Sequence, residues 1–208
     1  MEKKEIVRTG YNKVAERIQE ISGLEKEGSE ELNLLANFTS RIPLGGLILD
    51  AGCGYGVYSR YLSEKFKVIG VDISEKQIEL AKQNAPKAEF ICEDITKTNF
   101  PGEYFAGILA FYSIIHVPRE EHYDLLSNFF RMLKMNGVVL LVFQANDDPE
   151  SYENNFFSRG VKMYWSGFDE KADLDMLRRV GFRIIWSKSV KESPKWGESS
   201  HLFVFAEK

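Results

Sequence analysis

Short apolar runs alternate along most of the chain with segments whose apolar residues recur at helical spacing. Runs of about four to eight apolar residues are typical of buried strands, whereas apolar residues three or four apart indicate one face of a helix. This pattern predicts strands at residues 46–51, 67–72, 88–94, 104–114, 137–144, 182–190 and 201–208. It predicts helices between them at residues 55–66, 74–85, 119–134 and 169–180.

The order of these elements predicts an α/β fold. Strands that alternate with helices pair in parallel within one sheet, and strands that are apolar along their whole length are covered by helices on both faces. The last two strands, at 182–190 and 201–208, have no helix between them. We therefore expect those two strands to pair antiparallel, because a parallel pair needs a long crossover connection.

Two further helices are predicted before the first strand. The first ends at Gly23 and carries one apolar stripe, formed by Val7, Tyr11, Val14, Ile18 and Ile21. The second begins at the N-cap Ser29, has glutamates in its first turn and runs to about Ser40. Because the first of these helices is amphipathic, it must lie against another part of the molecule.

Residues 145–168 show neither a strand period nor a helix period. Long connections without regular structure are usually functional in compact domains. The aromatic side chains of this segment could form either a wall of a substrate pocket or a small satellite core, and periodicity does not decide between the two. These side chains are Tyr152, Phe156, Phe157, Tyr164, Trp165 and Phe168.

Composition narrows the possible partners. The chain has 208 residues, 44% of them hydrophobic, which suits one well-packed domain, and its net charge of −4 gives no overall basic field for nucleic acid. Cys53 and Cys92 have no metal-binding spacing, so neither a disulfide framework nor a metal site is indicated, and Cys92 is expected in the core. No secretory signal pattern is present, and no apolar run approaches the ~20 residues of a membrane span. We expect a soluble, unprocessed cytoplasmic protein of open oligomeric state.

The stretch LILDAGCGYG, at residues 47–56, places three glycines at alternate positions directly after a predicted strand. Each glycine costs about 0.5–1 kcal/mol in conformational freedom relative to alanine, so something must come close to this backbone. A strand, a glycine turn and a helix place a ligand at the carboxyl edge of a parallel sheet. The dinucleotide fingerprint needs Gly or Ala where this chain has Val57, and the lysine of a P-loop is absent, which disfavours NAD and nucleoside triphosphates.

Three aspartates end successive predicted strands: Asp50, Asp72 and Asp94. A carboxylate at Asp50 would repel a pyrophosphate, whereas it suits a ligand with an ammonium group. Asp72 stands where a carboxylate accepts hydrogen bonds from both hydroxyls of a ribose, and Asp94 could accept one from the amine of an adenine ring. Ammonium, ribose and adenine together describe S-adenosylmethionine (SAM).

Five segments resemble, in order and spacing, the successive motifs of small-molecule class I SAM-dependent methyltransferases: LILDAGCGYG, VIGVDIS, FICEDI, LAFYSIIHVPREE and LKMNGVVLLVF. The resemblance covers about Leu47 to Phe143 and extends more loosely towards both ends. It implies a Rossmann-like, doubly wound, mostly parallel seven-stranded sheet with N-terminal lid helices. The implied strand order is 3-2-1-4-5-7-6, with strand 7 antiparallel. The implied cofactor is SAM, and the implied product is S-adenosylhomocysteine.

The resemblance also implies roles for individual residues. The glycine turn would approach the methionine part of SAM, Ile73 and Gln77 would flank the adenine, and Ile95 would meet the adenine edge beside Asp94. Ala110 would lie near the sulfonium. With Asp50 from the charge argument above, the expected cofactor-binding residues are Tyr11, Asp50, Gly52, Cys53, Gly54, Asp72, Ile73, Gln77, Asp94, Ile95, Ala110 and Phe111.

Tyr11, on the first predicted helix, would close over the cofactor. His116 follows the fourth predicted strand, close to where an acceptor would meet the methyl group. It could be a general base, worth ~10²–10⁴ in rate, or a hydrogen-bonded structural imidazole that holds the loop. The substrate-binding residues that we expect are Tyr112, Met163, Tyr164 and Trp165.

The sequence therefore predicts an enzyme that moves a methyl group from SAM to a small-molecule acceptor. A methyltransferase that acts on protein or RNA and a non-catalytic SAM-binding module are the alternatives. We expect a single methyltransferase domain over residues 1–208. Its expected parts are an N-terminal helical lid (1–42), a cofactor-binding core (43–144), a substrate-side insertion (145–168), and a C-terminal helix with an antiparallel strand pair (169–208).

Overall fold

The computed structural model describes residues 2–21, 30–191 and 200–208. Its helices are α1 (Lys3–Ile21), α2 (Glu30–Thr39), α3 (Val57–Leu62), α4 (Glu75–Asn84), α5 (His122–Met132) and α6 (Glu170–Val180), with short 3-10 helices η1 (Ile114–His116) and η2 (Arg119–Glu121). Its strands are β1 (Leu47–Ala51), β2 (Lys67–Asp72), β3 (Glu89–Cys92), β4 (Phe105–Ala110), β5 (Leu133–Gln144), β6 (Asp148–Phe156), β7 (Val161–Gly167), β8 (Arg183–Lys191) and β9 (Ser200–Glu207).

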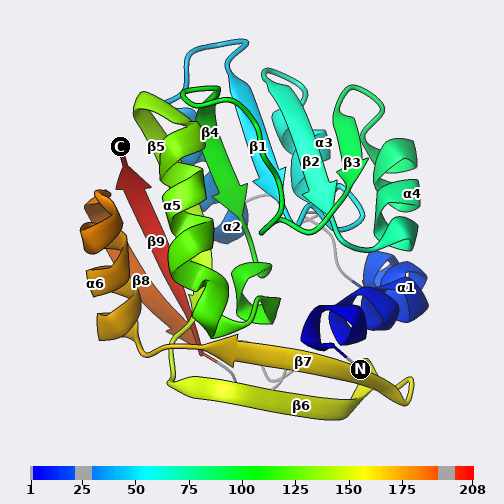
Figure 1. The fold of residues 1–208 in the computed structure, drawn as a ribbon. Helices are drawn as coiled ribbons and strands as arrows, with labels where there is room; N and C mark the ends of the chain where they lie inside the picture. The colour runs from blue at the N-terminus through cyan, green and yellow to red at the C-terminus, as the bar shows by residue number, and fades with distance from the viewer. Residues whose placement is uncertain (1, 22–29, 192–199) are drawn as a thin grey trace.

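Seven of these strands form one sheet in the order β3-β2-β1-β4-β5-β9-β8 (Figure 1). Numbered within this sheet alone, the order is the predicted 3-2-1-4-5-7-6. The strands from β1 to β5 pair in parallel, whereas β9 is antiparallel to both β5 and β8. The predicted Rossmann-like, doubly wound fold is therefore confirmed.

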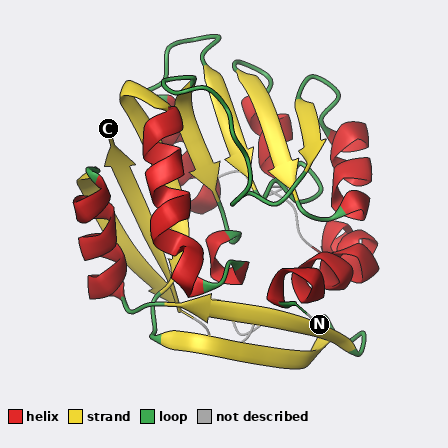
Figure 2. Cartoon of the chain, viewed as in Figure 1, coloured by secondary structure: helices red, strands yellow, loops and turns green. Residues whose placement is uncertain are grey.

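Helices cover both faces of this sheet, as its apolar strands require (Figure 2). On one face, α2 and α3 pack through the fully buried side chains of Phe38 and Leu62. On the opposite face, α5 and α6 pack through Phe129 and Leu177, which are also fully buried. The carboxyl ends of the parallel strands are thereby held in fixed positions along one edge of the sheet.

Helix boundaries follow the local signals in the sequence. Ser74 is the N-cap of α4, and its Oγ accepts a hydrogen bond of 3.1 Å from the backbone N–H of Gln77. Gly181 follows α6 with a φ of 121°, in the region that favours glycine. The predicted helix stop at Gly23 and the predicted N-cap Ser29 lie outside the described residues.

Residues 145–168, for which the sequence predicts no regular structure, contain an antiparallel hairpin of β6 and β7. This hairpin is a sheet of its own, and it lies beyond the carboxyl ends of the parallel strands (Figure 1). The prediction was wrong because β6 is polar and mostly exposed, and because the pairing shifts register between Asp148 and Ser151 and again between Glu153 and Phe156. Such irregularities interrupt the alternation by which strands are recognised.

α1 lies between α4 and the hairpin, near the N-terminus in Figure 1. Ile6 and Val7 of α1 pack against Met163 and Tyr164 of β7. The helix and the strand approach each other closely at Gly10, where an added Cβ would lie 2.7 Å from the Cε of Met163. α1 thus contacts the hairpin on one side and, through Asn12, Ser74 and Glu75 at the start of α4 on the other.

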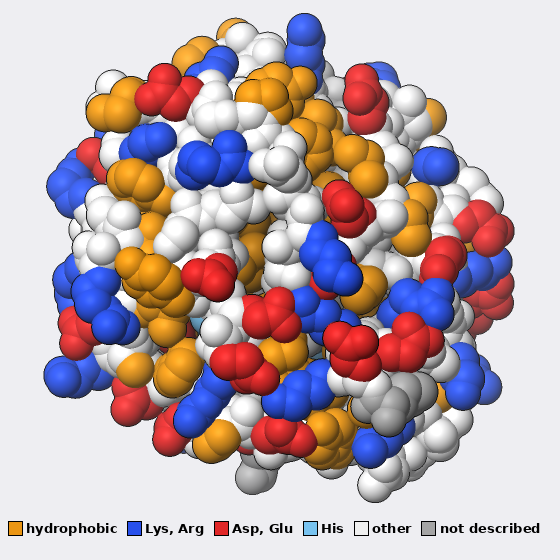
Figure 3. All heavy atoms as spheres, viewed as in Figure 1, with side chains coloured by type: hydrophobic (Ala, Val, Ile, Leu, Met, Phe, Trp, Pro, Cys, Tyr) orange, Lys and Arg blue, Asp and Glu red, His pale blue; other side chains and the backbone are white. Residues whose placement is uncertain are grey.

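The surface carries charges of both signs, and lysines, arginines, aspartates and glutamates are intermixed on the face shown in Figure 3. Cys53 is buried as a filler of the glycine turn, but Cys92 is exposed. The expectation that Cys92 is a core residue was wrong because β3 is an edge strand of the sheet. Within the described ranges, every helix is too short or too polar to cross a membrane.

Candidate active site

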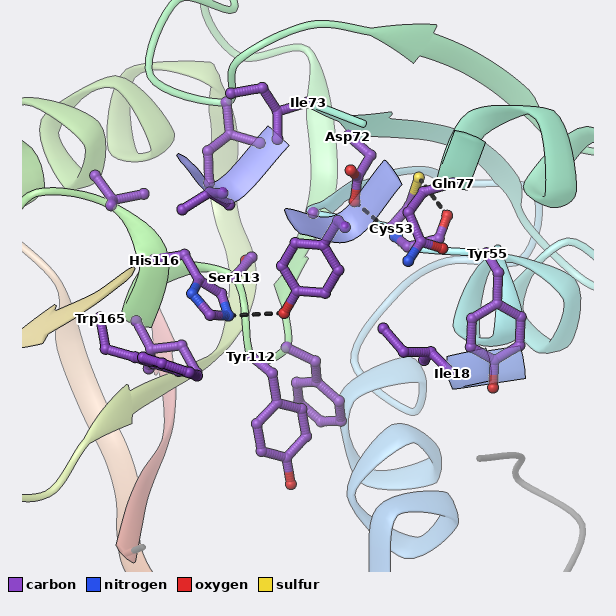
Figure 4. Close-up of a pocket in the computed structure, with 18 of the residues that line it drawn as sticks. Ile18, Cys53, Tyr55, Asp72, Ile73, Gln77, Tyr112, Ser113, His116 and Trp165 are labelled. Atoms are coloured by element: carbon purple, nitrogen blue, oxygen red, sulfur yellow. Dashed lines mark hydrogen bonds between the residues drawn. The ribbon is translucent and has the colours of Figure 1, made fainter. Parts of the chain in front are cut away.

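A cavity of about 730 Å³ opens between the carboxyl edge of the sheet, α1 and the hairpin. Its volume falls in the range of about 300–1,000 Å³ that is usual for small-molecule sites. In Figure 4, Asp72 and Cys53 lie on one side of this cavity, and His116 and Trp165 lie on another. The cavity therefore brings together elements that are far apart in the sequence.

The glycine turn forms part of the wall. Gly52 has a φ of 79°, and an added Cβ would lie 2.1 Å from the Cβ of Ser113, so this glycine allows the turn to pack against the segment after β4. Ser113 completes that packing by donating a hydrogen bond of 2.7 Å to the carbonyl oxygen of Ala51. Gly54 differs, because the nearest atom to its added Cβ is the Oε1 of Gln77 at 4.0 Å. The backbone at Gly54 is thus open to a ligand.

Asp72, at the end of β2, is hydrogen-bonded to the glycine turn that follows β1. Its Oδ2 accepts a hydrogen bond of 2.9 Å from the N–H of Gly54, and its Oδ1 accepts one of 2.9 Å from the N–H of Ser74. Burial raises the pKa of Asp72 to about 6, although these backbone hydrogen bonds act in the opposite direction. Asp72 is therefore an ionised acceptor at neutral pH, and it lines the cavity.

Asp94, shortly after β3, is joined to the N-terminal helix. Its Oδ2 lies 2.9 Å from the Nζ of Lys4, and its Oδ1 accepts hydrogen bonds of 2.9 Å from both the N–H and the Oγ1 of Thr96. Burial pushes the pKa of Asp94 upwards, but the hydrogen bonds from Lys4 and Thr96 outweigh it, so the pKa lies below its ordinary value. Asp94 thus stays charged and also fastens α1 over the edge of the sheet.

Asp50 does not line the cavity, so the expectation that it faces the ligand was wrong. The side chains of a strand alternate between its two faces, and Asp50 shares the face of Ile48, beneath α3. There its Oδ2 accepts a hydrogen bond of 2.6 Å from the Oγ of Ser59, and burial raises its pKa to about 7. Ala110, another expected cofactor residue, is fully buried behind the wall that Phe111 provides.

Tyr11 and His116 form a hydrogen-bonded pair inside the cavity. The Nε2 of His116 lies 2.7 Å from the hydroxyl of Tyr11, and its Nδ1 lies 2.7 Å from the carbonyl oxygen of Tyr164. A carbonyl oxygen can only accept, so Nδ1 carries the proton and Nε2 accepts from Tyr11. Burial lowers the pKa of His116 to about 4 and raises that of Tyr11, so both groups are neutral at pH 7.

Aromatic side chains form the wall opposite the glycine turn. The rings of Phe156 and Trp165 lie 5.4 Å apart between centroids, and the ring of Trp165 lies 5.5 Å from that of His116. Tyr112, whose φ is 53°, contacts the ring of His201 at 5.2 Å. Trp165 and Tyr112 are therefore placed in the cavity, as the sequence predicts.

Met163 and Tyr164 are not part of this wall, contrary to expectation. Both are fully buried in the small cluster beneath α1. Met163 shares a strand face with Trp165, but it lies under Gly10. The aromatic segment therefore supplies both structures that the sequence left open, a satellite core at Tyr164 and a cavity wall at Trp165.

Most of the expected cofactor residues do line the cavity: Tyr11, Gly52, Cys53, Gly54, Asp72, Ile73, Gln77, Asp94, Ile95 and Phe111. Sequence reasoning missed several others, among them Lys4, Tyr58, Ser113, Gln144 and Glu153. The rule that ligands bind at the carboxyl ends of parallel strands could have found Ser113 and Gln144, which follow or end β4 and β5. No local signal identifies Lys4, which comes from a distant helix.

Gln77 provides a test of whether this wall suits a polar ligand such as SAM. Its side chain is 1% exposed, yet its Oε1 has no hydrogen-bond partner among the described residues. Buried polar atoms are normally hydrogen-bonded. The unpartnered oxygen lies beside the open backbone of Gly54, within reach of the cavity, so a donor from a bound molecule would complete this site.

Comparisons with known proteins agree with this geometry. A family model described as a methyltransferase domain matches residues 48–137. The chain is 31% identical over 172 residues to trans-aconitate 2-methyltransferase from Enterobacter sp. (strain 638), a match that covers 73% of this chain and 67% of that protein. It is 34% identical over 168 residues to phosphoethanolamine N-methyltransferase 1 from Arabidopsis thaliana, with coverage of 77% and 32%.

Solved structures show the same fold. Magnesium protoporphyrin IX methyltransferase from Synechocystis PCC 6803 with bound SAM aligns with a TM-score of 0.73 at 20% identity, covering 100% of this chain and 98% of that one. The chain therefore belongs to the class I SAM-dependent methyltransferases, whose cofactor is SAM. It spans less than two thirds of the length of several curated relatives, including 32% of the Arabidopsis enzyme.

Proposed function

We propose that the chain is an enzyme that transfers the methyl group of SAM to a small molecule inside the described cavity. The observation that carries this proposal is the placement of two strand-end carboxylates, Asp72 and Asp94, on one wall and of aromatic rings on the opposite wall. One cavity thus offers acceptors for a nucleoside and an apolar compartment beside them. α1 and the hairpin border this cavity, which supports a small acceptor over a protein or RNA.

Cofactor binding would use the groups that the cavity presents. Asp72 would accept hydrogen bonds from the ribose hydroxyls, and Asp94 from the adenine amine, since each carboxylate oxygen has lone pairs beyond those already used. Gln77 would flank the adenine with Ile73 and satisfy its own buried oxygen. The open backbone at Gly54 would meet the methionine part.

Bound SAM would supply a methyl group on a sulfonium sulfur, whose carbon–sulfur bond would break with its electron pair left on sulfur as a lone pair of the acceptor forms the new bond to carbon. The chain's own contribution is placement in a site from which water is excluded, an effect that can reach roughly 7–11 kcal/mol. Phe111 and Tyr112, at the end of β4, border the region where the two reactants would meet.

His116 is best explained as a positioning residue in this reaction. Its Nε2 lone pair is already occupied by the Tyr11 hydroxyl, and with a pKa of about 4 it would hold an extra proton poorly at neutral pH. The pair instead fixes the hydroxyl oxygen of Tyr11, which keeps lone pairs to accept a hydrogen bond from a ligand. We propose that the pair also closes α1 over the cofactor.

We expect the substitution Tyr11→Phe to loosen this closure. One hydrogen bond of about 0.5–1.5 kcal/mol net is lost, and the Nε2 of buried His116 loses its donor. S-adenosylhomocysteine should therefore bind roughly 3–10-fold more weakly in a calorimetric titration. Amide hydrogen exchange in residues 3–21 should become faster in the same variant. Tyr61→Phe, which removes a hydroxyl from an exposed side chain, is the matched control. Unchanged affinity and unchanged exchange for Tyr11→Phe would contradict the assigned role.

The proposed function itself is tested by calorimetric titration of the native chain with SAM and, separately, with NAD. We expect saturable binding of SAM at a stoichiometry of about one per chain and no binding of NAD, because the dinucleotide fingerprint needs Gly or Ala where this chain has Val57. Incubation with SAM labelled in its methyl group and a metabolite extract should then yield S-adenosylhomocysteine. Binding of NAD without binding of SAM would overturn the proposal, and binding of SAM without turnover of any acceptor would indicate a SAM-binding module.

We further propose a division of labour within a single domain over residues 1–208. Residues 43–144 would hold the cofactor, 145–168 would form the acceptor side, and α1, within residues 1–42, would provide the lid, whereas α2 covers a face of the sheet. A cytoplasmic location is also proposed, supported by the two free cysteines, one of them exposed.

A further inference from the structure

The acceptor side of the cavity is built mainly from aromatic rings. Phe156 and Trp165 meet at an interplanar angle of 75°, and Tyr112 meets His201 at 90°. These ring pairs come from two separate parts of the chain, the hairpin and the ends of β4 and β9. Offset and edge-to-face contacts with such rings favour a flat aromatic guest, each worth about 0.5–1.5 kcal/mol beyond the area buried.

Most of the charged side chains that line this cavity are acidic. Among the described residues, Lys4 is the one lysine or arginine that lines the cavity. Its ammonium group already contacts three oxygen-bearing side chains: Asp94 at 2.9 Å, Thr96 at 2.6 Å, and Glu121. An ammonium has three N–H donors, so these contacts use its full capacity. The ammonium group of Lys4 is therefore already paired, and these contacts attach α1 to the edge of the sheet.

Negative charge, in contrast, faces the acceptor side. Glu153 of β6, an exposed side chain, lines the cavity together with Phe156. His116 is neutral at pH 7 and uses both ring nitrogens in hydrogen bonds. An acceptor with a phosphate or carboxylate would lose its water here and gain no described counter-charge, which is unfavourable. A cationic group would be attracted both by the carboxylates and by the faces of the aromatic rings.

We propose that the acceptor of this enzyme is an aromatic nitrogen base, a molecule with a flat ring and an amine and without a phosphate or carboxylate group. This inference rests on the proposed function, because it places the acceptor beside bound SAM. It concerns binding of the protonated amine before methyl transfer, so it can be measured without turnover; the amine would release that proton to water before its lone pair takes the methyl group. Tryptamine and indole-3-propionate are suitable probes, since they share a ring and a two-carbon linker but end in an ammonium and a carboxylate.

The experiment begins with a calorimetric titration of the full chain with S-adenosylhomocysteine, which tests the proposed function alone. Each indole probe is then titrated into the chain saturated with S-adenosylhomocysteine. We expect tryptamine to bind at least ten-fold more tightly than indole-3-propionate at pH 7. Equal affinities, tighter binding of the acid, or no binding of either probe to the saturated chain would overturn the inference and leave the proposed function standing.

Substitution of Glu153 adds a second readout. Glu153→Gln keeps the size of the side chain and removes its charge, so we expect the ratio of the two affinities to fall roughly three-fold. Glu89→Gln, on the exposed edge strand β3 and away from the lining of the cavity, is the matched control and should leave the ratio unchanged. The same ratio in Glu153→Gln and in Glu89→Gln would show that Glu153 does not select the charge of the acceptor.

Discussion

Replacing Asp72 with alanine should weaken the binding of SAM by about 100-fold. The carboxylate of Asp72 holds the N–H groups of Gly54 and Ser74 at 2.9 Å each, and it would accept from the ribose as well. Hydrogen bonds to a charged group contribute about 1.5–3 kcal/mol each, so the loss of two ribose bonds reaches about 3 kcal/mol. Calorimetric titration with SAM measures this change directly.

The controls for this prediction separate charge from folding. Asp124→Ala removes an exposed carboxylate from α5 and should leave the affinity within two-fold of the native chain. Circular dichroism of Asp72→Ala should show that the sheet and helices persist, because its two backbone partners belong to the turns that follow β1 and β2. If Asp72→Ala binds SAM as tightly as Asp124→Ala does, Asp72 is not the ribose acceptor.

The same carboxylate makes binding depend on pH. Burial places the pKa of Asp72 near 6, above its ordinary value. Protonation removes acceptor capacity, so the affinity for SAM should be constant above pH 7 and fall as the pH drops through about 6. The variant Asp72→Ala should lack this dependence over the same range.

A second large effect, on the free energy of unfolding, is expected when Asp173 is substituted. Asp173 does not line the cavity. Asp173 in α6 is fully buried, and neither of its carboxylate oxygens has a hydrogen-bond partner among the described residues. Burial, with a smaller contribution from the charge of Asp169, raises the pKa of Asp173 to about 8. Above that pH the folded protein would hold an uncompensated buried charge. Asp173→Asn should therefore raise the free energy of unfolding by about 2–4 kcal/mol at pH 8.

The sign of the pH dependence follows from proton linkage. Between about pH 4 and pH 8 the folded state keeps a proton on Asp173 that the unfolded state releases, so the contribution of this group destabilises the native protein increasingly as the pH rises. Urea unfolding should show that Asp173→Asn raises the free energy of unfolding more at pH 8 than at pH 5. Asp175→Asn, on the same helix but with an exposed side chain, should change stability by less than about 0.5 kcal/mol. A gain that is equal at both pH values would refute the raised pKa.

Much of the fold could be predicted because its signals are local. Apolar runs such as residues 47–51 and 67–72 identify buried strands, and Ser74 and Gly181 mark helix ends through their own backbone geometry. The residues that end parallel strands meet at one edge by topology alone. For this reason Asp72 and Asp94 were found without any knowledge of side-chain contacts.

The remaining features depend on which way side chains point. Asp72 is the last residue of β2, but Asp50 is the next-to-last residue of β1, and strand alternation turns it towards Ser59 under α3 instead of into the cavity. Met163 and Trp165 share one strand face, and only the position of α1 decides that the first is buried under a helix and the second borders the cavity. Lys4 was missed because its partner Asp94 is 90 positions away in the sequence.

The close packing of α1 at Gly10 couples the two halves of the cavity mechanically. The same helix is tied to the end of β3 through Lys4 and seated on the hairpin through Met163. A displacement of α1 as a whole would therefore disturb the wall at Asp94 and the hairpin border of the cavity together.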